Sequence, residues 1–143
     1  MKVTQILKQK GSATVETIAA ERTIGEAARL MGQKRIGALV VAEADGHIAG
    51  ILSERDIVRH LGSDGSAALG LKVRRAMTEQ VECCSPDDDA MHLLERMTAG
   101  RFRHMPVMEG GRMAGLLSIG DVVKARIDEI EAENEAMATM LSG

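Results

Sequence analysis

Two copies of one short motif carry residues that could do chemistry. The form Gly-x-x-Ser-x-x-Asp occurs from Gly50 to Asp56 and again from Gly115 to Asp121. A serine at a helix start adds a hydroxyl to unpaired backbone N–H groups, which together can hold phosphate. An aspartate one turn later can accept hydrogen bonds from both hydroxyls of a ribose. The glycines leave room for a ligand or a strand to approach closely.

The same motif also has an interpretation that needs no ligand. Ser-x-x-Asp is a capping box, in which Ser53 with Asp56, or Ser118 with Asp121, satisfies the backbone N–H groups at the start of its own helix. A duplicated fold would duplicate its caps. Recurrence alone therefore does not decide between binding and capping.

The chain aligns with itself, and this repeat predicts the elements that position the two motifs. Segments 20–31 and 86–97 correspond, as do segments 35–41 and 101–107. Each copy has a short strand, a helix, two strands joined by a glycine-containing turn, and a second helix that starts at the motif serine. We expect strands at 15–18, 38–42, 47–52, 81–84, 105–108 and 112–117.

Capping signals mark the first helix of each copy. Thr23 and Glu26 form a predicted capping box ahead of an apolar pattern with helical spacing. In the second copy Ser85 is the expected cap and Pro86 the expected first helical residue.

The predicted fold class is α+β, with two β-α-β-β-α repeats and a C-terminal helix. A sheet covered on only part of each face predicts that the repeats pack sheet to sheet with pseudo-twofold symmetry, leaving two equivalent clefts. We expect repeat 1 at 1–62, a linker and lead-in strand at 63–76, repeat 2 at 77–125 and an acidic helix at 126–143. The linker includes a flexible stretch at 62–66.

The C-terminal region is predicted to be one long helix from Val122 to Leu141 with solvated acidic side chains. Apolar residues and one asparagine recur along it at coiled-coil spacing, which favours a homodimer. The stripe consists of Ile127, Ile130, Asn134, Met137 and Leu141.

Composition excludes several classes of protein. Net charge is -3, the basic residues are scattered, and Phe102 is the one aromatic residue, all of which argue against nucleic-acid binding. The chain has no long apolar run and no apolar leader, so we expect no membrane association and a cytoplasmic location. Catalytic motifs are absent, so we expect no enzyme.

Two adjacent cysteines, Cys83 and Cys84, poorly suit a disulfide or a shared metal, because neighbouring strand residues point to opposite faces. We expect reduced packing residues and no metal site. Metal or thiol sensing through both cysteines and His104 stays open as a remote alternative.

Taken together, the sequence motifs resemble the CBS domain (cystathionine-β-synthase-type repeat), here as a tandem pair or Bateman module. The resemblance runs from about Val3 to Lys124. It depends on the phrases Arg35–Val41, Gly50–Arg59, Met77-Thr78 and Arg103–Val107.

This resemblance implies an adenosyl-ligand module. The aspartate would hold the ribose, the serine and basic residues would meet phosphates, and apolar strand segments would sandwich the adenine, with each cleft built from both repeats. One cleft would combine Ser118 and Asp121 with Gly11, Glu16, Ile36 and Gly37. The other would combine Ser53, Arg55 and Asp56 with Met77, Glu82, Phe102 and Arg103, and His104 next to Arg103 would attract phosphate.

The resemblance favours AMP as ligand and NAD(H) next, with ADP, ATP and S-adenosylmethionine also compatible. The implied role is signal transduction by energy sensing, as a homodimer acting on an unidentified effector protein. The halves differ, since Gly37-Ala38 corresponds to Arg103-His104 and Arg55 to Gly120, so we expect clefts of unequal strength. The alternative is a protein–protein interaction or dimerisation module whose clefts are vestigial.

Overall fold

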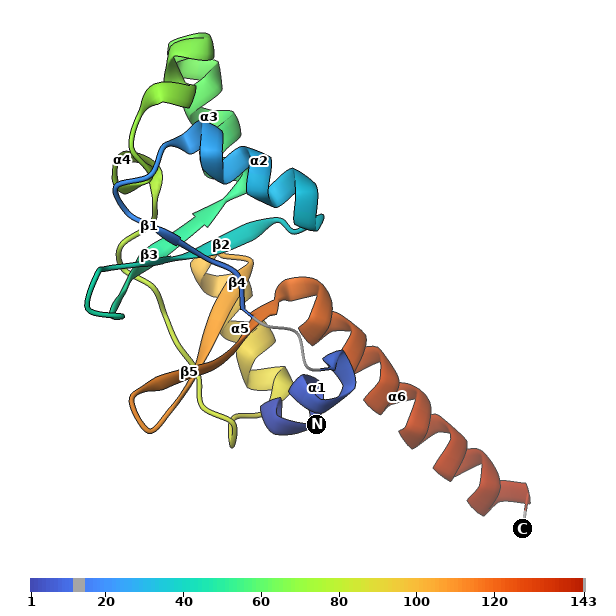
Figure 1. Cartoon of the computed structure of the whole chain (residues 1–143). Helices are drawn as coiled ribbons and strands as arrows, with labels where there is room; N and C mark the ends of the chain where they lie inside the picture. Colours follow the sequence, from blue (N-terminus) through green and yellow to red (C-terminus); the bar gives the residue numbers. More distant parts are fainter. Residues whose placement is uncertain (12–14, 143) are drawn as a thin grey trace. The chain divides into compact units, whose positions relative to one another are not determined.

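A computed structural model describes residues 1–11 and 15–142, and the chain forms two compact units. The first-repeat unit is Val15–Val81, and the second-repeat unit joins Met1–Thr14 to Glu82–Gly143. Each contains helices and one sheet, and a long helix ends the chain (Figure 1). The predicted α+β class with two repeats and a C-terminal helix is confirmed.

The first-repeat unit has a three-stranded sheet in the order β1-β2-β3, with β1 parallel to β2 and β3 antiparallel to it. Ile24, Leu39, Leu52 and Val73 are fully buried in its core. In chain order its elements are β1 (Thr17–Ala19), α2 (Ile24–Lys34), β2 (Ala38–Ala42), β3 (Ile48–Ser53), α3 (Glu54–Asp64), the 3₁₀ helix η1 (Gly65–Gly70) and α4 (Val73–Ala76).

The second-repeat unit has a two-stranded antiparallel sheet, β4-β5. Val3, Leu93, Met105 and Leu117 are fully buried in its core. Its elements are α1 (Val3–Lys10), α5 (Ala90–Gly100), β4 (His104–Glu109), β5 (Arg112–Ser118) and α6 (Ile119–Ser142). The predicted long C-terminal helix is confirmed as part of α6, although Glu129 is half-buried rather than solvated and pairs with Arg126 at 3.1 Å.

The strand predicted at 81–84 is wrong. Cys84 forms an isolated parallel β-bridge to Val107, and residues 81–84 form no continuous strand. In the first-repeat unit the Val40 N–H donates to the Glu16 carbonyl at 3.2 Å, which extends the pairing that β1 makes. The corresponding residue of β4 is Pro106, which has no N–H to donate, so the ladder stops.

The predicted helix start at Pro86 is also wrong. The Asp88 carboxylate accepts the Ser85 N–H at 2.8 Å, and the Asp88 N–H donates to the Ser85 carbonyl at 3.1 Å. These bonds close a turn, so α5 begins at Ala90. In the first copy the predicted cap is confirmed, since the Thr23 hydroxyl accepts the Glu26 N–H at 3.1 Å.

The stretch expected to be a flexible linker is helical. Residues 62–64 end α3, and residues 65–70 form η1, in which Ala68 is fully buried. The segment expected as a lead-in strand contains α4. Burial of Ala68 against the repeat gives this glycine-rich sequence a fixed path that its composition does not predict.

The two segments that lead into the repeats are exchanged between the units. Val3, ahead of the first repeat, donates its N–H to the Asp88 carbonyl of the second-repeat unit at 2.8 Å. Val73, ahead of the second repeat, donates to the Arg22 carbonyl of the first-repeat unit at 2.7 Å. We call residues 1–10 and 71–78 the lead-in segments. Each compact unit is therefore completed by the lead-in segment of the other repeat.

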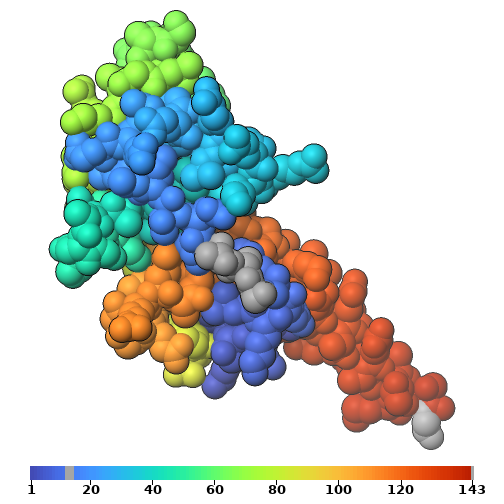
Figure 2. Space-filling view, in the orientation of Figure 1, coloured from blue at the N-terminus to red at the C-terminus, as the bar shows by residue number. Residues whose placement is uncertain are grey.

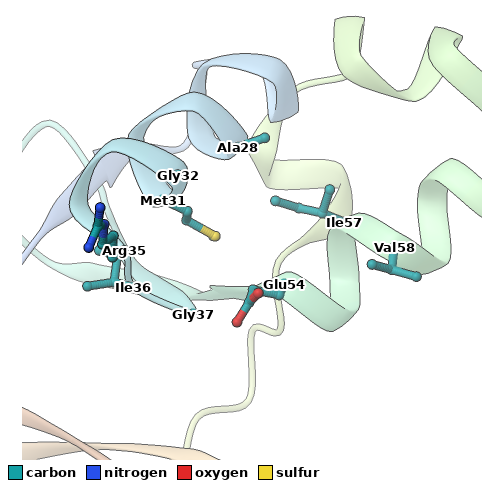
Figure 3. A pocket seen from close by; sticks show the side chains of 9 residues that line it. All are labelled: Ala28, Met31, Gly32, Arg35, Ile36, Gly37, Glu54, Ile57 and Val58. Atoms are coloured by element: carbon teal, nitrogen blue, oxygen red, sulfur yellow. The ribbon is translucent and has the colours of Figure 1, made fainter.

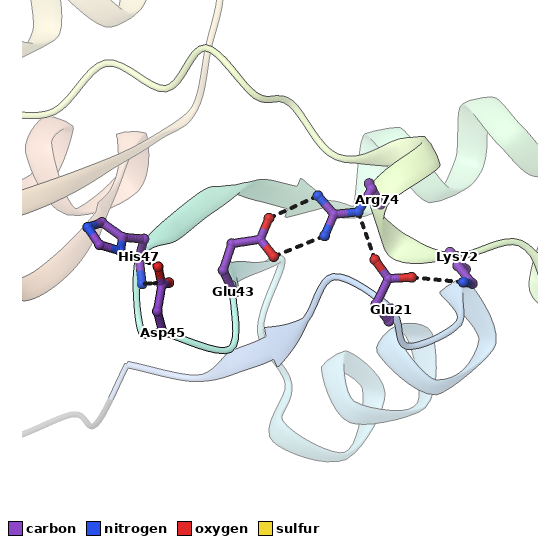
Figure 4. Close-up of polar contacts among 6 residues, drawn as sticks. All are labelled: Glu21, Glu43, Asp45, His47, Lys72 and Arg74. Carbon is purple, nitrogen blue, oxygen red and sulfur yellow. Dashed lines mark hydrogen bonds and ion pairs between the residues drawn. The ribbon is translucent and has the colours of Figure 1, made fainter.

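Ion pairs attach the 71–78 lead-in segment to its unit (Figure 4). The Arg74 guanidinium donates to Glu21 at 2.8 Å and to both oxygens of Glu43 at 2.9 and 3.0 Å, and Lys72 pairs with Glu21 at 2.8 Å. The hydrogen bonds that Arg74 donates to Glu43 and to Glu21 raise the pKa of Arg74. These side chains are exposed, so the pairs orient the segment more than they stabilise it.

Candidate functional site

The first motif lies at the start of α3 and forms a reciprocal cap. Ser53 donates its N–H and its hydroxyl to Oδ2 of Asp56, at 2.9 and 3.0 Å. The Asp56 N–H donates back to Ser53 Oγ at 3.3 Å. Asp56 is only 6% exposed, and its Oδ1 has a long contact of 3.5 Å with the Arg59 guanidinium.

The second motif repeats this cap at the start of α6 but adds a distant residue. The Ser118 N–H donates to Oδ2 of Asp121 at 2.8 Å, and the Asp121 N–H donates to Ser118 Oγ at 3.1 Å. The Lys10 ammonium, from the end of α1, donates to the same Oδ2 at 2.9 Å and to the Leu116 carbonyl at 2.8 Å. Both motifs thus have the geometry of a capping box.

Asp121 is a carboxylate held in its charged form. Burial acts to raise its pKa, but hydrogen bonds from the Ser118 N–H and the Lys10 ammonium outweigh that effect. The pKa of Asp121 therefore lies below its ordinary value. An ionised carboxylate accepts hydrogen bonds and donates none, which suits it to hold hydroxyl groups.

The motif glycines make room for the lead-in segments. A Cβ on Gly50 would overlap the carbonyl oxygen of Thr78, which accepts the Ile51 N–H at 3.1 Å. A Cβ on Gly115 would lie 2.7 Å from Cδ2 of Leu7 in α1. The glycines were expected to leave room for a ligand or for a strand. In the structure they leave room for neighbouring segments of the protein chain.

A cavity of about 470 Å³ lies between α2 and α3 of the first-repeat unit (Figure 3). Ile36 and Gly37 line it, with Arg35 and Glu54 beside them. Gly37 must be small there, because a Cβ would lie 2.5 Å from the Glu54 carboxylate. Neither motif aspartate lines this cavity, so it brings two predicted site residues together without the predicted ribose acceptor.

The remaining predicted residues fall into packing and surface positions. Met77 packs on the core of the first-repeat unit, and Phe102 packs on that of the second-repeat unit. His104 lies opposite Ser118 in the β4–β5 ladder, so these two predicted residues are neighbours. Glu16 is half-buried 3.7 Å from Lys34.

Three predicted residues lie on or near the surface of their own units. Arg55 and Arg103 are exposed, and Gly11 ends α1. The crossed sets join residues of different units, and they stay a prediction.

Lys10 is the site residue that sequence reasoning missed. It lies 111 residues from Asp121 along the chain, and no motif contains it. One feature of the sequence could have indicated Lys10. It lies within the stretch that resembles the CBS domain, but in a segment that has no counterpart in the alignment of the two repeats.

The cysteines offer little for the sensing alternative. Burial raises the pKa of Cys84 to about 11 and also raises that of Cys83, so both thiols are protonated at neutral pH and react slowly. Across residues 1–11 and 15–142 no group of three or more His, Cys, Asp or Glu side chains is placed to hold a metal ion. In the same described part, no helix combines the length and apolar character needed to cross a bilayer.

Comparison with known proteins identifies the repeats. The family model for the CBS domain matches residues 12–63 and 73–128. A CBS-domain containing protein of Agrobacterium tumefaciens is 47% identical, with a TM-score of 0.84 over 87% of this chain and 92% of that one. A mitochondrial CBS domain-containing protein of Arabidopsis thaliana is 30% identical over 99% of this chain and 72% of its own length.

A more distant structure, 22% identical, has a TM-score of 0.78 over 90% of this chain and 98% of its own. That structure is a CBS domain pair in complex with 5′-methylthioadenosine and S-adenosyl-L-methionine. At this identity it supports the fold alone. With two matched segments that cover most of its length, this chain belongs to the CBS-domain family as a tandem pair of repeats.

Proposed function

We propose that this chain is a regulatory module that binds an adenine nucleotide, AMP or a related ligand such as NAD(H), in clefts formed by its two repeats. The observation that carries the proposal is the duplicated carboxylate at a helix start. In each motif the Ser N–H contacts Oδ2 of Asp56 or Asp121, which leaves Oδ1 with one long contact or none among the described residues. That oxygen can accept a ribose hydroxyl.

A known ligand class agrees with this chemistry. The distant CBS pair described above binds two adenosyl compounds, which share adenine and ribose with AMP and NAD(H). In this chain the serines and nearby cations would meet the phosphates, and the apolar strand segments would contact the adenine. Binding would shift the equilibrium between arrangements of the module in proportion to its difference in affinity for each, and an effector protein would read that shift.

A thermal-shift panel tests the proposal. AMP, ADP, ATP, NAD(H), S-adenosylmethionine and 5′-methylthioadenosine are added to the wild type, with GMP as base control. A ligand at 100 times its dissociation constant should stabilise the folded state by about 2.7 kcal/mol. Asp56→Ala and Asp121→Ala should each remove part of that shift, whereas Glu135→Ala, an exposed acid of α6, should not. No shift with any adenine ligand contradicts the proposal.

A second function is favoured by the outer half of α6. Every residue from 131 to 142 is exposed, and an isolated helix of that length is marginal in water without packing. Figure 2 shows this red segment uncovered on the face in view. Its apolar stripe includes Ile127, 49% exposed, and Met137, 61% exposed, at coiled-coil spacing. A homodimer through α6 would bury that stripe.

Analytical ultracentrifugation separates this dimerisation function from ligand binding. The double variant Ile130→Glu with Met137→Glu should convert a dimer to a monomer, because both changes place a charge in the stripe. Ala132→Glu adds the same charge on another face of the helix and should leave the dimer intact. A wild-type protein that sediments as a monomer at micromolar concentrations would exclude the α6 dimer.

A further inference from the structure

Lys10 places a cation beside Asp121 from outside the second repeat. In the first motif Arg55 follows the serine by two residues, and Arg59 lies one turn further along α3. In the second motif the position of Arg55 is Gly120, and Lys124, at the position of Arg59, lies 3.9 Å from Asp128. The charge beside Asp121 comes instead from the 1–10 lead-in segment.

The two lead-in segments donate different groups to corresponding carbonyls of β3 and β5. The Ile51 carbonyl of β3 accepts the backbone N–H of Thr78 at 2.9 Å. Its counterpart in β5, the Leu116 carbonyl, accepts the Lys10 ammonium at 2.8 Å. A backbone amide is thus replaced by a side chain that carries charge, and this side chain also contacts Asp121.

The exchange changes which hydrogen-bond donors are left for a ligand. The Ser53 hydroxyl donates its hydrogen bond to Oδ2 of Asp56. At the second motif the Lys10 ammonium also donates to Oδ2 of Asp121, and the Ser118 hydroxyl accepts the Asp121 N–H. One of the three ammonium protons of Lys10 is left to donate.

We propose that Lys10 is a specificity-determining residue that makes the Ser118–Asp121 motif select adenosine ligands bearing a phosphate over uncharged adenosine. The inference rests on the proposed function and deepens it. A phosphate near an uncompensated carboxylate would be repelled, and the ammonium 2.9 Å from Asp121 cancels that charge. Its remaining N–H then donates to a phosphate oxygen, while Oδ1 of Asp121 accepts a ribose hydroxyl.

Isothermal titration with AMP and with adenosine tests this inference, and the ratio of the two dissociation constants is the readout. The ratio is compared within each variant, so a general loss of affinity or of stability cancels. Lys10→Met should reduce the preference for AMP about tenfold, the value of one charge-assisted hydrogen bond, and Lys10→Arg should retain most of it. Lys8→Met removes the same charge from an exposed position of α1 and should keep the wild-type ratio.

Asp56→Ala serves as a background in which binding reports the second motif. A Lys10→Met protein with the wild-type AMP preference overturns the inference, and so does an equal loss in Lys8→Met, since that would reflect the overall charge. A wild-type protein that binds neither AMP nor adenosine rejects the proposed function itself. The two failures are therefore distinguishable, because one appears in the wild type and the other only in the variants.

Discussion

Asp56 and Asp121 occupy corresponding positions at the starts of α3 and α6, yet the chain covers the two motifs differently. Backbone from the 71–78 lead-in segment lies against Gly50, whereas the side chains of Leu7 and Lys10 lie against the second motif. The serine–aspartate cap is kept in both because each helix needs its first N–H groups satisfied. Equal motifs can therefore stand in unequal electrostatic surroundings.

The largest difference between the halves should appear at the motif glycines. Gly50→Ala forces a methyl group onto the Thr78 carbonyl, which is held in a β-bridge, and should destabilise the protein by about 3 kcal/mol or more. Gly115→Ala meets the end of the flexible Leu7 side chain and should cost about 1 kcal/mol. Urea unfolding followed by circular dichroism measures both. Equal costs would show that the lead-in segments pack alike.

The serines should give a smaller difference. Ser53→Ala removes two hydroxyl hydrogen bonds to Asp56 and should cost about 1 to 2 kcal/mol, at the upper end for a helix cap. Ser118→Ala removes one bond to Asp121, while Lys10 still holds the carboxylate, and should cost about 0.5 to 1 kcal/mol. The same unfolding assay applies. A larger cost at Ser118 would contradict the assigned donors.

The smallest effect concerns acid stability. Because the folded-state pKa of Asp121 is lowered, its charge stabilises the fold above the unfolded value of about 3.9 and loses that effect as pH falls through the folded-state pKa. Lys10→Met should cost about 0.5 kcal/mol at pH 7, discounted for partial exposure, and less at pH 2.5. Arg59→Met, at the long 3.5 Å contact with Asp56, should change little at either pH.

Unfolding curves at both pH values give this comparison. A Lys10→Met cost that does not depend on pH would mean that the lysine acts by packing on the strand edge and not by its charge. A cost in Arg59→Met equal to that in Lys10→Met would remove the electrostatic difference between the two motifs.

Local sequence predicted the elements best where a strand is apolar throughout. Residues 38–42 were predicted to be a strand and form β2, since four of the five are buried. Prediction failed where pairing decides the outcome. Residues 81–84 resemble the first strand of the other repeat, but Pro106 on the neighbouring strand cannot donate the bond that would extend the ladder.

The site shows the same division. Spacing located both motif serines and aspartates, and the structure brings each pair together at a helix start. Lys10 escaped prediction because its contact with Asp121 depends on α1 crossing to the second-repeat unit. A contact between segments so far apart in the chain leaves no periodic trace in either one.

The exchange of lead-in segments sets an order on biosynthesis. The first-repeat unit is one continuous stretch, Val15–Val81, and it can fold as soon as that stretch leaves the ribosome. Residues 1–10 contact Asp88, Gly115 and Asp121, so their partners are made only late in the synthesis of the chain. In a released fragment that ends near residue 90, Val15–Val81 should therefore be folded while residues 1–10 are cut readily by protease.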